Sequence, residues 1–417
     1  MKTKIAIAGI LTAVSIGFPQ EDLKEQIEVL KEEIRQLRLE VAMPEITMET
    51  YSGLGPAASK ALLNPKGVSI GGYGQVDFLN RVKGDGPSLF QGEKKAFTDV
   101  YRLIMYFGYS FTEKLKLNTE IEWEHADEVA VEFAFIDYAF NPAFGIRGGT
   151  LLTPFGIINE LHEPPTYFPV YKPYLETEII PTAWRENGFG FYGEYGPTEY
   201  RFYVMNGFKA KKGSFNPKAP LKDLRQKASK ALTDSVALTG RFDVNLPKNL
   251  KVGVAGFFSG VQDEEGKEVG RVNMVDLRLI WQYAGFDVRL LGVLVNSESA
   301  DKITLALSEP LCQADPTRCN VFPKSMGGYY VQVAYDIFRF FDMEDQELYL
   351  FAMYEDYDRA REVPDRYSKP EDSKVNVINA GIVYKPHPLV ALKADYVVEK
   401  EGRDTDEIVR TEIAWMF

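Results

Sequence analysis

Apolar and polar residues alternate along most of the chain that follows residue 67. In the last run of the sequence, Ile413, Trp415 and Phe417 share one face, whereas Arg410 and Glu412 share the other. Successive side chains of a β-strand point to opposite faces, so this pattern predicts strands with one apolar and one polar face. Roughly sixteen such runs follow one another, each near the ~10-residue length of a tilted membrane strand.

The connections between these runs alternate in length, as they do in outer-membrane barrels. Short turns are predicted at residues 112–114, 141–143, 196–198, 246–249, 284–285 and 385–388. Longer polar loops are predicted at residues 81–96, 153–187, 209–232, 261–270, 298–325, 358–374 and 401–406. Aromatic residues near the strand ends favour a membrane barrel over a soluble β-sandwich.

The pattern therefore predicts an all-β fold, a transmembrane antiparallel β-barrel over residues 67–417. Such a barrel belongs in a cell outer membrane, in contact with its lipid. The alternation fails near Asp137, where a β-bulge is expected.

Two segments with other patterns precede the predicted barrel. Residues 1–20 have a positively charged start and a short apolar stretch, which predicts a secretory signal peptide. Residues 21–43 carry apolar residues at alternating spacings of four and three, which predicts a short α-helical coiled coil. The seam of this coiled coil consists of Leu23, Ile27, Leu30, Ile34, Leu37 and Val41. A single amphipathic helix packed on its own protein is the alternative, and residues 44–66 are expected to be a linker.

Composition narrows the class of protein. The chain is 45% hydrophobic yet 26% charged, with a mean hydropathy of -0.21, which does not suit a helical membrane protein. Its formal net charge of -12 argues against nucleic acid as a partner, because phosphates demand clustered Lys and Arg. The only two cysteines, Cys312 and Cys319, predict a local disulfide. A metal site would need more ligands than two thiols, so neither a metal nor a cofactor is expected.

The inner face of a barrel of this size must be polar if it encloses water. Charged residues of both signs fall on the inferred inward face, where they would discriminate among solutes by charge. The basic residues predicted to line the pore are Arg102, Arg147, Arg201, Arg241, Arg278, Arg289, Lys393 and Arg410. The alternative is that these side chains are merely solvated and pair with one another.

The longest connection, residues 153–187, is rich in proline and aromatic residues, which indicates a segment packed against something. We expect it to fold into the barrel mouth and constrict the pore. Its charged residues would then be Glu160, His162, Glu163, Lys172, Arg185 and Glu186. A lid on the outer surface and a subunit contact are the alternatives.

Three short stretches carry a family resemblance: GGTLLTPFG at 148–156, TAWRENGFG at 182–190 and YRFYVMNG at 200–207. They resemble the phosphate-selective porin O and P family and related porins with an N-terminal coiled coil. The resemblance implies sixteen strands, a homotrimer, an inward-folded third loop and passive uptake of small solutes. Phosphate selectivity is not expected, because no dense lysine cluster lies near the predicted pore mouth. The seam departs from the family, since Ile at a with Leu at d favours two strands over three.

The sequence thus favours a porin that lets small anions or other small hydrophilic solutes diffuse across the outer membrane. A structural protein that ties the membrane to the cell wall through residues 21–41 is the runner-up. An enzyme is not expected, because a hydrolase needs a nucleophile with a positioned histidine. None of the three histidines, His125, His162 and His387, is predicted beside an obvious serine.

Overall fold

The computed structural model describes residues 26–34, 48–84, 96–308, 320–341, 343 and 345–417. The chain divides into two units, Met1–Glu45 and Ile46–Phe417. In the first unit, residues 26–34 form an α-helix on which Ile27, Leu30 and Ile34 are exposed. The predicted signal peptide, the seam residues Leu23, Leu37 and Val41, and the pair Cys312 and Cys319 lie outside the described residues.

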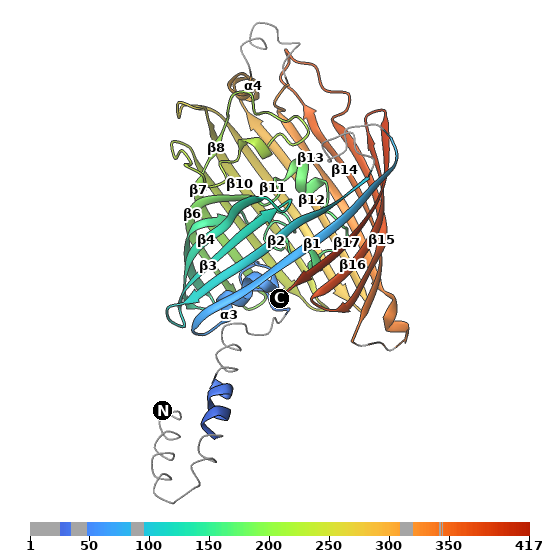
Figure 1. Ribbon diagram of the computed structural model, residues 1–417. Coiled ribbons are helices and arrows are strands. Elements are labelled where there is room, and N and C mark those ends of the chain that lie inside the picture. The colour runs from blue at the N-terminus through green and yellow to red at the C-terminus, as the bar shows by residue number, and fades with distance from the viewer. Residues whose placement is uncertain (1–25, 35–47, 85–95, 309–319, 342, 344) are drawn as a thin grey trace, which may run out of the picture. The chain divides into compact units, whose positions relative to one another are not determined.

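The second unit is a closed antiparallel β-barrel (Figure 1). Its first half consists of β1 (Gly67–Lys83), β2 (Ala96–Ser110), β3 (Leu115–Glu124), β4 (Glu128–Asn141), β5 (Phe144–Leu152), β6 (Arg185–Tyr195), β7 (Thr198–Asn206) and β9 (Val236–Leu246). Its second half consists of β10 (Leu250–Gln262), β11 (Glu268–Tyr283), β12 (Phe286–Glu298), β13 (Ser325–Asp336), β14 (Glu347–Glu362), β15 (Lys374–His387), β16 (Val390–Glu401) and β17 (Asp404–Met416). A two-residue strand, β8 (Phe208–Lys209), pairs in parallel with β10.

The ring closes where β1 pairs with β17, in a register that sets Tyr73 opposite Met416 and Asp77 opposite Glu412. The chain end extends this seam, because the backbone N–H and C=O of Phe417 both bond to Gly72 at 2.9 Å. The expectation of an all-β antiparallel barrel with about sixteen long strands is therefore confirmed.

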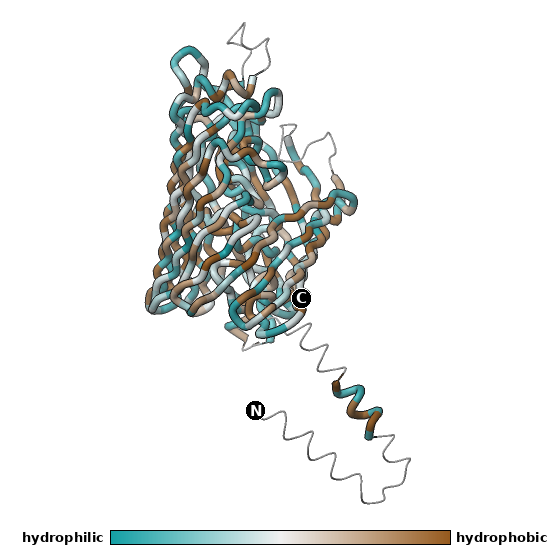
Figure 2. Tube along the Cα trace, turned by 90° about the vertical axis from the view of Figure 1, so that its left-hand side faces the viewer, coloured by the Kyte–Doolittle hydropathy of each residue, from teal (hydrophilic) through white to brown (hydrophobic). Residues whose placement is uncertain are grey.

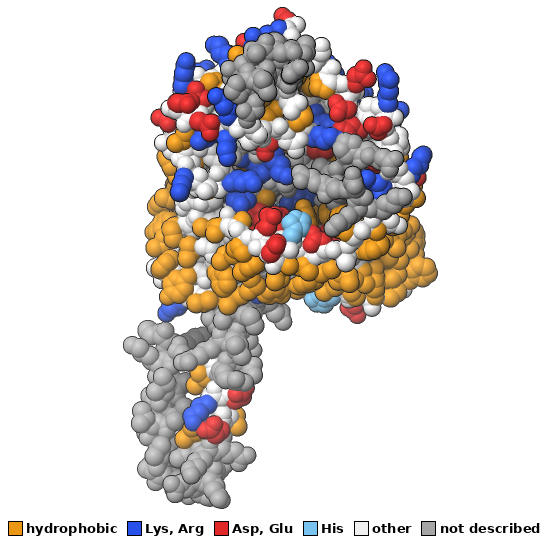
Figure 3. Space-filling view, turned by 45° about the horizontal axis from the view of Figure 1, so that its top comes forward, with side chains coloured by type: hydrophobic (Ala, Val, Ile, Leu, Met, Phe, Trp, Pro, Cys, Tyr) orange, Lys and Arg blue, Asp and Glu red, His pale blue; other side chains and the backbone are white. Residues whose placement is uncertain are grey.

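The two faces of the wall differ as a membrane barrel requires. On β11, Leu277 points outward and is 65% exposed, whereas Asp276 and Arg278 on either side are at most 4% exposed. Apolar residues recur along the strands (Figure 2), and a band of hydrophobic side chains crosses the lower part of the barrel on the face shown in Figure 3. Charged side chains gather at the end where the longer connections lie. Among the helices of the described residues, none has the length and apolarity needed to cross a membrane.

A β-bulge is predicted near Asp137, and the register of β4 with β5 shifts close to it, between Ala139 and Asn141. A second shift, in the β3–β4 register, lies five residues before Asp137, because Glu120 pairs with Phe133 whereas Ile121 pairs with Val131. Glu132 is therefore the extra residue of the bulge, and it is buried together with Phe133. A bulge rotates the strand by one position, so two consecutive side chains can face the barrel interior.

The segment expected to be a linker contains a buried helix. Helix α3 (Pro56–Leu63) begins with proline at its first position, where the missing N–H costs nothing. Its Ala57, Ala58 and Ala61 are at most 3% exposed, and it contacts β1, β2 and β3 at the lower end of the barrel (Figure 1). A second helix, α4 (Ala300–Leu307), lies in the connection between β12 and β13. The linker prediction is therefore wrong for residues 56–63, where small apolar side chains allow close packing.

Candidate functional site

Residues 153–184 connect β5 to β6 and are called the inner loop below. Wall residues from all round the barrel contact this loop through hydrogen bonds or ion pairs. They are Glu120 of β3, Arg201 of β7, Arg241 of β9, Asp276 of β11, Arg289 of β12, Tyr330 of β13, Glu355 of β14, and Lys393 and Asp395 of β16. Because these strands surround the barrel axis, the inner loop lies inside the barrel and is no outer lid (Figure 1).

Wall carboxylates accept hydrogen bonds from the backbone of the inner loop. The N–H of Gly156 donates to Asp276 at 2.7 Å, and the N–H of Val170 donates to Asp395 at 2.9 Å. Glu355 accepts two further loop N–H groups, at 3.0 and 2.8 Å. Hydrogen bonds to charged groups contribute about 1.5–3 kcal/mol each, so these contacts fix the path of the loop.

Basic wall residues hold the aromatic side chains of the loop. The Lys393 ammonium lies 4.1 Å from the ring centre of Tyr167, and the Arg410 guanidinium lies 5.1 Å from that of Tyr171. Lys393 also donates to the carbonyl of Pro169 at 3.0 Å. The aromatic residues that marked this loop in the sequence therefore meet cations of the wall.

The eight basic residues predicted to line a pore all occupy inward positions; seven are at most 6% exposed, and the side chain of Arg241 is 8% exposed. Their nearest polar partners are Gln75 for Arg102, Asp137 for Arg147, Glu160 and Asp243 for Arg201 and Arg241, Asp243 and Asp276 for Arg278, Asp287 for Arg289, Glu412 for Lys393 and Asp395 for Arg410. In this structure they do not line open water. The inner loop covers six of them, whereas Arg147 and Arg278 are enclosed by side chains of the wall itself.

The six charged residues predicted for the constriction are all inside the barrel and at most 9% exposed. Two of them, Arg185 and Glu186, are the first residues of β6 and not part of the loop. Arg185 pairs with Glu132 at 3.2 Å, and Glu186 accepts a hydrogen bond from Asn206 at 2.6 Å. Lys172 donates to the hydroxyl of Thr182 at 3.1 Å.

Glu160 and Glu163 attach the inner loop to different parts of the barrel. Glu160 pairs with Arg201 at 3.2 Å and with Arg241 at 3.3 Å. Glu163 accepts the N–H groups of Ala57 and Ala58, at 3.0 and 2.9 Å, in the first turn of α3. A carboxylate at a helix N-terminus is favourable, because the first N–H groups of a helix have no partner within it. His162 belongs to a separate cluster with Glu120 and Glu132.

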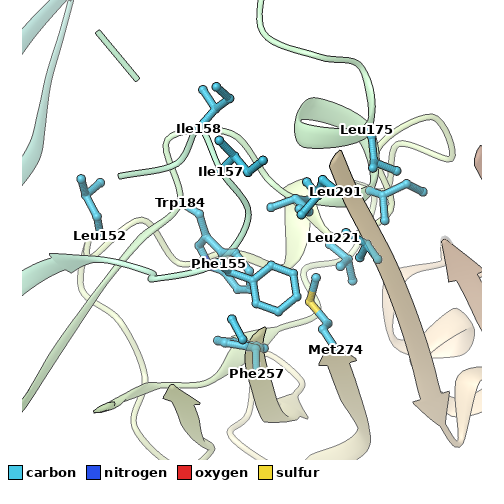
Figure 4. Close-up of a cluster of buried hydrophobic side chains, with 14 of the residues drawn as sticks. Leu152, Phe155, Ile157, Ile158, Leu175, Trp184, Leu221, Phe257, Met274 and Leu291 are labelled. Carbon is cyan, nitrogen blue, oxygen red and sulfur yellow. The ribbon is translucent and has the colours of Figure 1, made fainter. Parts of the chain in front are cut away.

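An apolar cluster, which the sequence reasoning missed, lies where the loop leaves β5 and returns to β6 (Figure 4). Trp184 is fully buried, with its ring centre 4.4 Å from that of Phe257 and 6.2 Å from that of Phe155. Met274 and Leu291, inward residues of β11 and β12, belong to the same cluster. These large apolar residues at inward positions were a signal of a filled interior, because a water-filled lumen would favour polar ones.

The fold and the site define an outer-membrane β-barrel whose third loop is packed inside it. No protein-family model matches the chain. A protein of Aquifex aeolicus (strain VF5), described as uncharacterized, is 55% identical over 393 residues, which cover 92% of this chain and 87% of that protein. The chain belongs to the same family as that protein.

Solved structures of outer-membrane proteins share the fold. The channel DcaP of Acinetobacter baumannii aligns with a TM-score of 0.56 and 12% identity over 84% of this chain and 97% of its own. OmpF of Salmonella typhi, in complex with daunomycin, aligns with a TM-score of 0.54 and 9% identity over 85% and 98%. In-vitro folded OmpT of Vibrio cholerae, in its trimer form, aligns with a TM-score of 0.51 and 9% identity over 84% and 100%. At such identities the likeness concerns the barrel fold alone.

Proposed function

We propose that the protein is a channel for passive diffusion of small hydrophilic solutes or ions, which the inner loop holds closed in the state described. The observation that carries this proposal is the inner loop itself, folded into the barrel and fixed by wall charges such as Asp395 and Lys393. A closed conformation held by individual polar contacts can open when water replaces those contacts. The channel DcaP, which shares the fold, supports the same class of function.

The proposal includes a homotrimer. The trimer form of OmpT among the similar structures supports it, as do the exposed apolar residues Ile27, Leu30 and Ile34 on the helix at residues 26–34. In a coiled coil these side chains would pack between helices of neighbouring chains. The resemblance to the phosphate-selective porin O and P family supports the inward third loop and the trimer, and we do not extend it to phosphate as the solute.

A structural role is the second candidate, and the filled interior favours it. A barrel that never opens could anchor the N-terminal helix, which would then bind the cell wall. Sedimentation of the full chain with purified cell wall, compared with a chain that lacks residues 21–41, tests this candidate. Binding that requires those residues would support the tether.

Conductance across a planar bilayer tests the channel. The full chain should give discrete current steps. The substitution Glu355→Gln weakens the carboxylate that accepts two loop N–H groups, so it should increase the conductance or the open time severalfold. Glu362→Gln is the matched control, because Glu362 ends the same strand and is exposed. If neither variant nor the parent chain gives current steps, the channel is refuted and the structural role is the remaining candidate.

A further inference from the structure

Glu120, Glu132 and His162 form a buried cluster inside the barrel. They come from β3, β4 and the inner loop, and each is at most 2% exposed. The His162 Nε2 atom lies 3.1 Å from Glu120 Oε1 and 3.4 Å from Glu132 Oε2. One ligand atom from each of the three residues lies within 4.8 Å of the other two.

The β-bulge in β4 creates this cluster. Without the extra residue, Glu132 and Phe133 would point to opposite faces of the wall, so one of them would meet lipid. With the bulge, both are buried, and Glu132 faces the interior near Glu120 of the neighbouring strand. A bulge costs ladder hydrogen bonds, so its position beside the cluster indicates that the inward carboxylate matters.

The proton on His162 can be placed from its hydrogen bonds. Its Nδ1 atom lies 2.9 Å from the carbonyl oxygen of Asn159, which can only accept, so Nδ1 carries the hydrogen. In the neutral ring, Nε2 therefore presents a lone pair to two carboxylates. Three acceptors that face one another repel unless a cation or a proton lies between them. A backbone carbonyl that orients the far nitrogen is also the usual arrangement for a histidine that binds a metal.

The carboxylate oxygens are left short of donors. Glu132 is paired with Arg185 through Oε1 and is also hydrogen-bonded with the side chain of Glu122, whereas Glu120 Oε2 has no hydrogen-bond donor among the described residues. A proton on Nε2 could satisfy only one of the two carboxylates. A metal ion would accept both of them and the imidazole together. The geometry therefore suits a cation better than a single proton.

We propose that Glu120, Glu132 and His162 bind a divalent transition-metal ion, for which Zn²⁺ is the probe. Zinc takes histidine nitrogen and carboxylate oxygen at roughly 2.0–2.2 Å, so tetrahedral ligands lie about 3.3–3.6 Å apart. The 3.4 Å separation lies within this range, and the 3.1 Å separation lies just below it. Ca²⁺ and Mg²⁺ fit less well, since they prefer oxygen ligands only. This proposal differs from the expectation, drawn from the sequence, that the chain has no metal.

The bound ion would link two wall strands to the inner loop. It would therefore hold the loop in the barrel independently of the charged contacts described above. This inference goes beyond the proposed channel, because a metal site in this place would stabilise the loop whether or not the barrel conducts.

Folding the denatured full chain into detergent micelles with equimolar Zn²⁺ tests the site, because a buried site must be loaded during folding. After dialysis against a chelator, elemental analysis of the wild type should find about one zinc per chain. His162→Gln and Glu120→Gln should each lose the zinc. Removal of a ligand should lower the zinc affinity by more than the 10- to 100-fold that outer-shell changes cause. His125→Gln is the control for surface binding, because His125 is 48% exposed and hydrogen-bonded to Asp99.

Heat-dependent mobility in electrophoresis checks that each variant folds. If His162→Gln does not fold, the site is tested by the zinc content of Glu120→Gln and by zinc-edge X-ray absorption of the loaded wild type. That spectrum should show one imidazole ligand. Folded wild type without zinc, or ligand variants that keep as much zinc as the wild type, would overturn the site and indicate a proton shared within the cluster. Zinc content needs no conductance measurement, so failure here leaves the channel proposal standing.

Discussion

The inner loop is held by two regions of different chemistry. Where it meets β5 and β6, Phe155 and Trp184 pack against apolar wall residues such as Phe257. Along its middle, residues 166–178, Phe168 also packs on Phe351, but the hydrogen bonds of this part include charged wall residues such as Asp395 and Arg289. Apolar contacts have no substitute in water, whereas charged groups regain hydration when they separate. The ends of the loop are therefore permanent anchors, and the middle is where a path for water would open.

The largest effect should come from the apolar region. Trp184→Ala removes a fully buried ring, and loss of a large aromatic from a core costs about 3–5 kcal/mol. We expect denaturant unfolding in detergent to show this loss of stability. Phe189→Ala is the control, because Phe189 lies on the same strand but is 66% exposed on the outer face. Equal destabilisation by both substitutions would contradict the distinction between anchor and outer wall.

The middle of the loop should respond less in stability and more in conductance. Asp395→Asn takes away the charge that pairs with Arg410 at 2.7 Å and accepts the N–H of Val170. We expect the free energy of unfolding to fall by about 2–3 kcal/mol and the current through the barrel to increase. Asp404→Asn is the control, because Asp404 lies at the exposed start of β17. It should change neither the stability nor the current. A variant with lower stability but unchanged current would show that the middle of the loop does not control the path.

A single neutral hydroxyl should have a smaller effect. Tyr330→Phe deletes the donor to Glu176 at 2.8 Å and leaves a buried carboxylate short of one hydrogen bond, at a cost of about 1–2 kcal/mol. The melting temperature in detergent is the measurement. Tyr329→Phe serves for comparison, since the neighbouring ring is 47% exposed on the outside and its loss should be neutral.

The smallest effect on the barrel should come from the N-terminal unit. Deletion of residues 21–41 leaves every described barrel contact in place, so unfolding of the barrel should not change. Oligomer formation should become slower or weaker, because the proposed coiled coil is lost. Sedimentation and the heat resistance of the oligomer measure this. A truncated chain that assembles as fast as the full one would assign residues 21–41 to another task.

The wall was predictable because a strand of a membrane barrel repeats every two residues, and runs such as Ile413, Trp415 and Phe417 carry that period without interruption. The bulge at Glu132 could not be predicted, because apolar and polar residues still alternate around it. Only the pairing with β3 shows the extra residue. Helix α3 was missed although Pro56 and the alanines after it are typical of a helix start.

The interior was harder to predict for a different reason. The basic residues of the wall were assigned to the inner face correctly, but their partners come from a loop distant in sequence, as Glu160 does for Arg241. The cluster of Glu120, Glu132 and His162 has no characteristic spacing, because three separate segments supply its ligands. Period and composition describe one segment at a time, so they cannot show which segments meet.

The pairing of β1 with β17 has a consequence for the order of assembly. Tyr73 finds its partner Met416 only when nearly the whole chain has been delivered, so the ring cannot close earlier. Contacts between such distant residues form slowly, because a long loop must be closed first. Until then β1 has an unpaired edge that can join a strand of another chain. Shielding the edge of the first strand until the last one arrives would therefore reduce pairing with other chains during export.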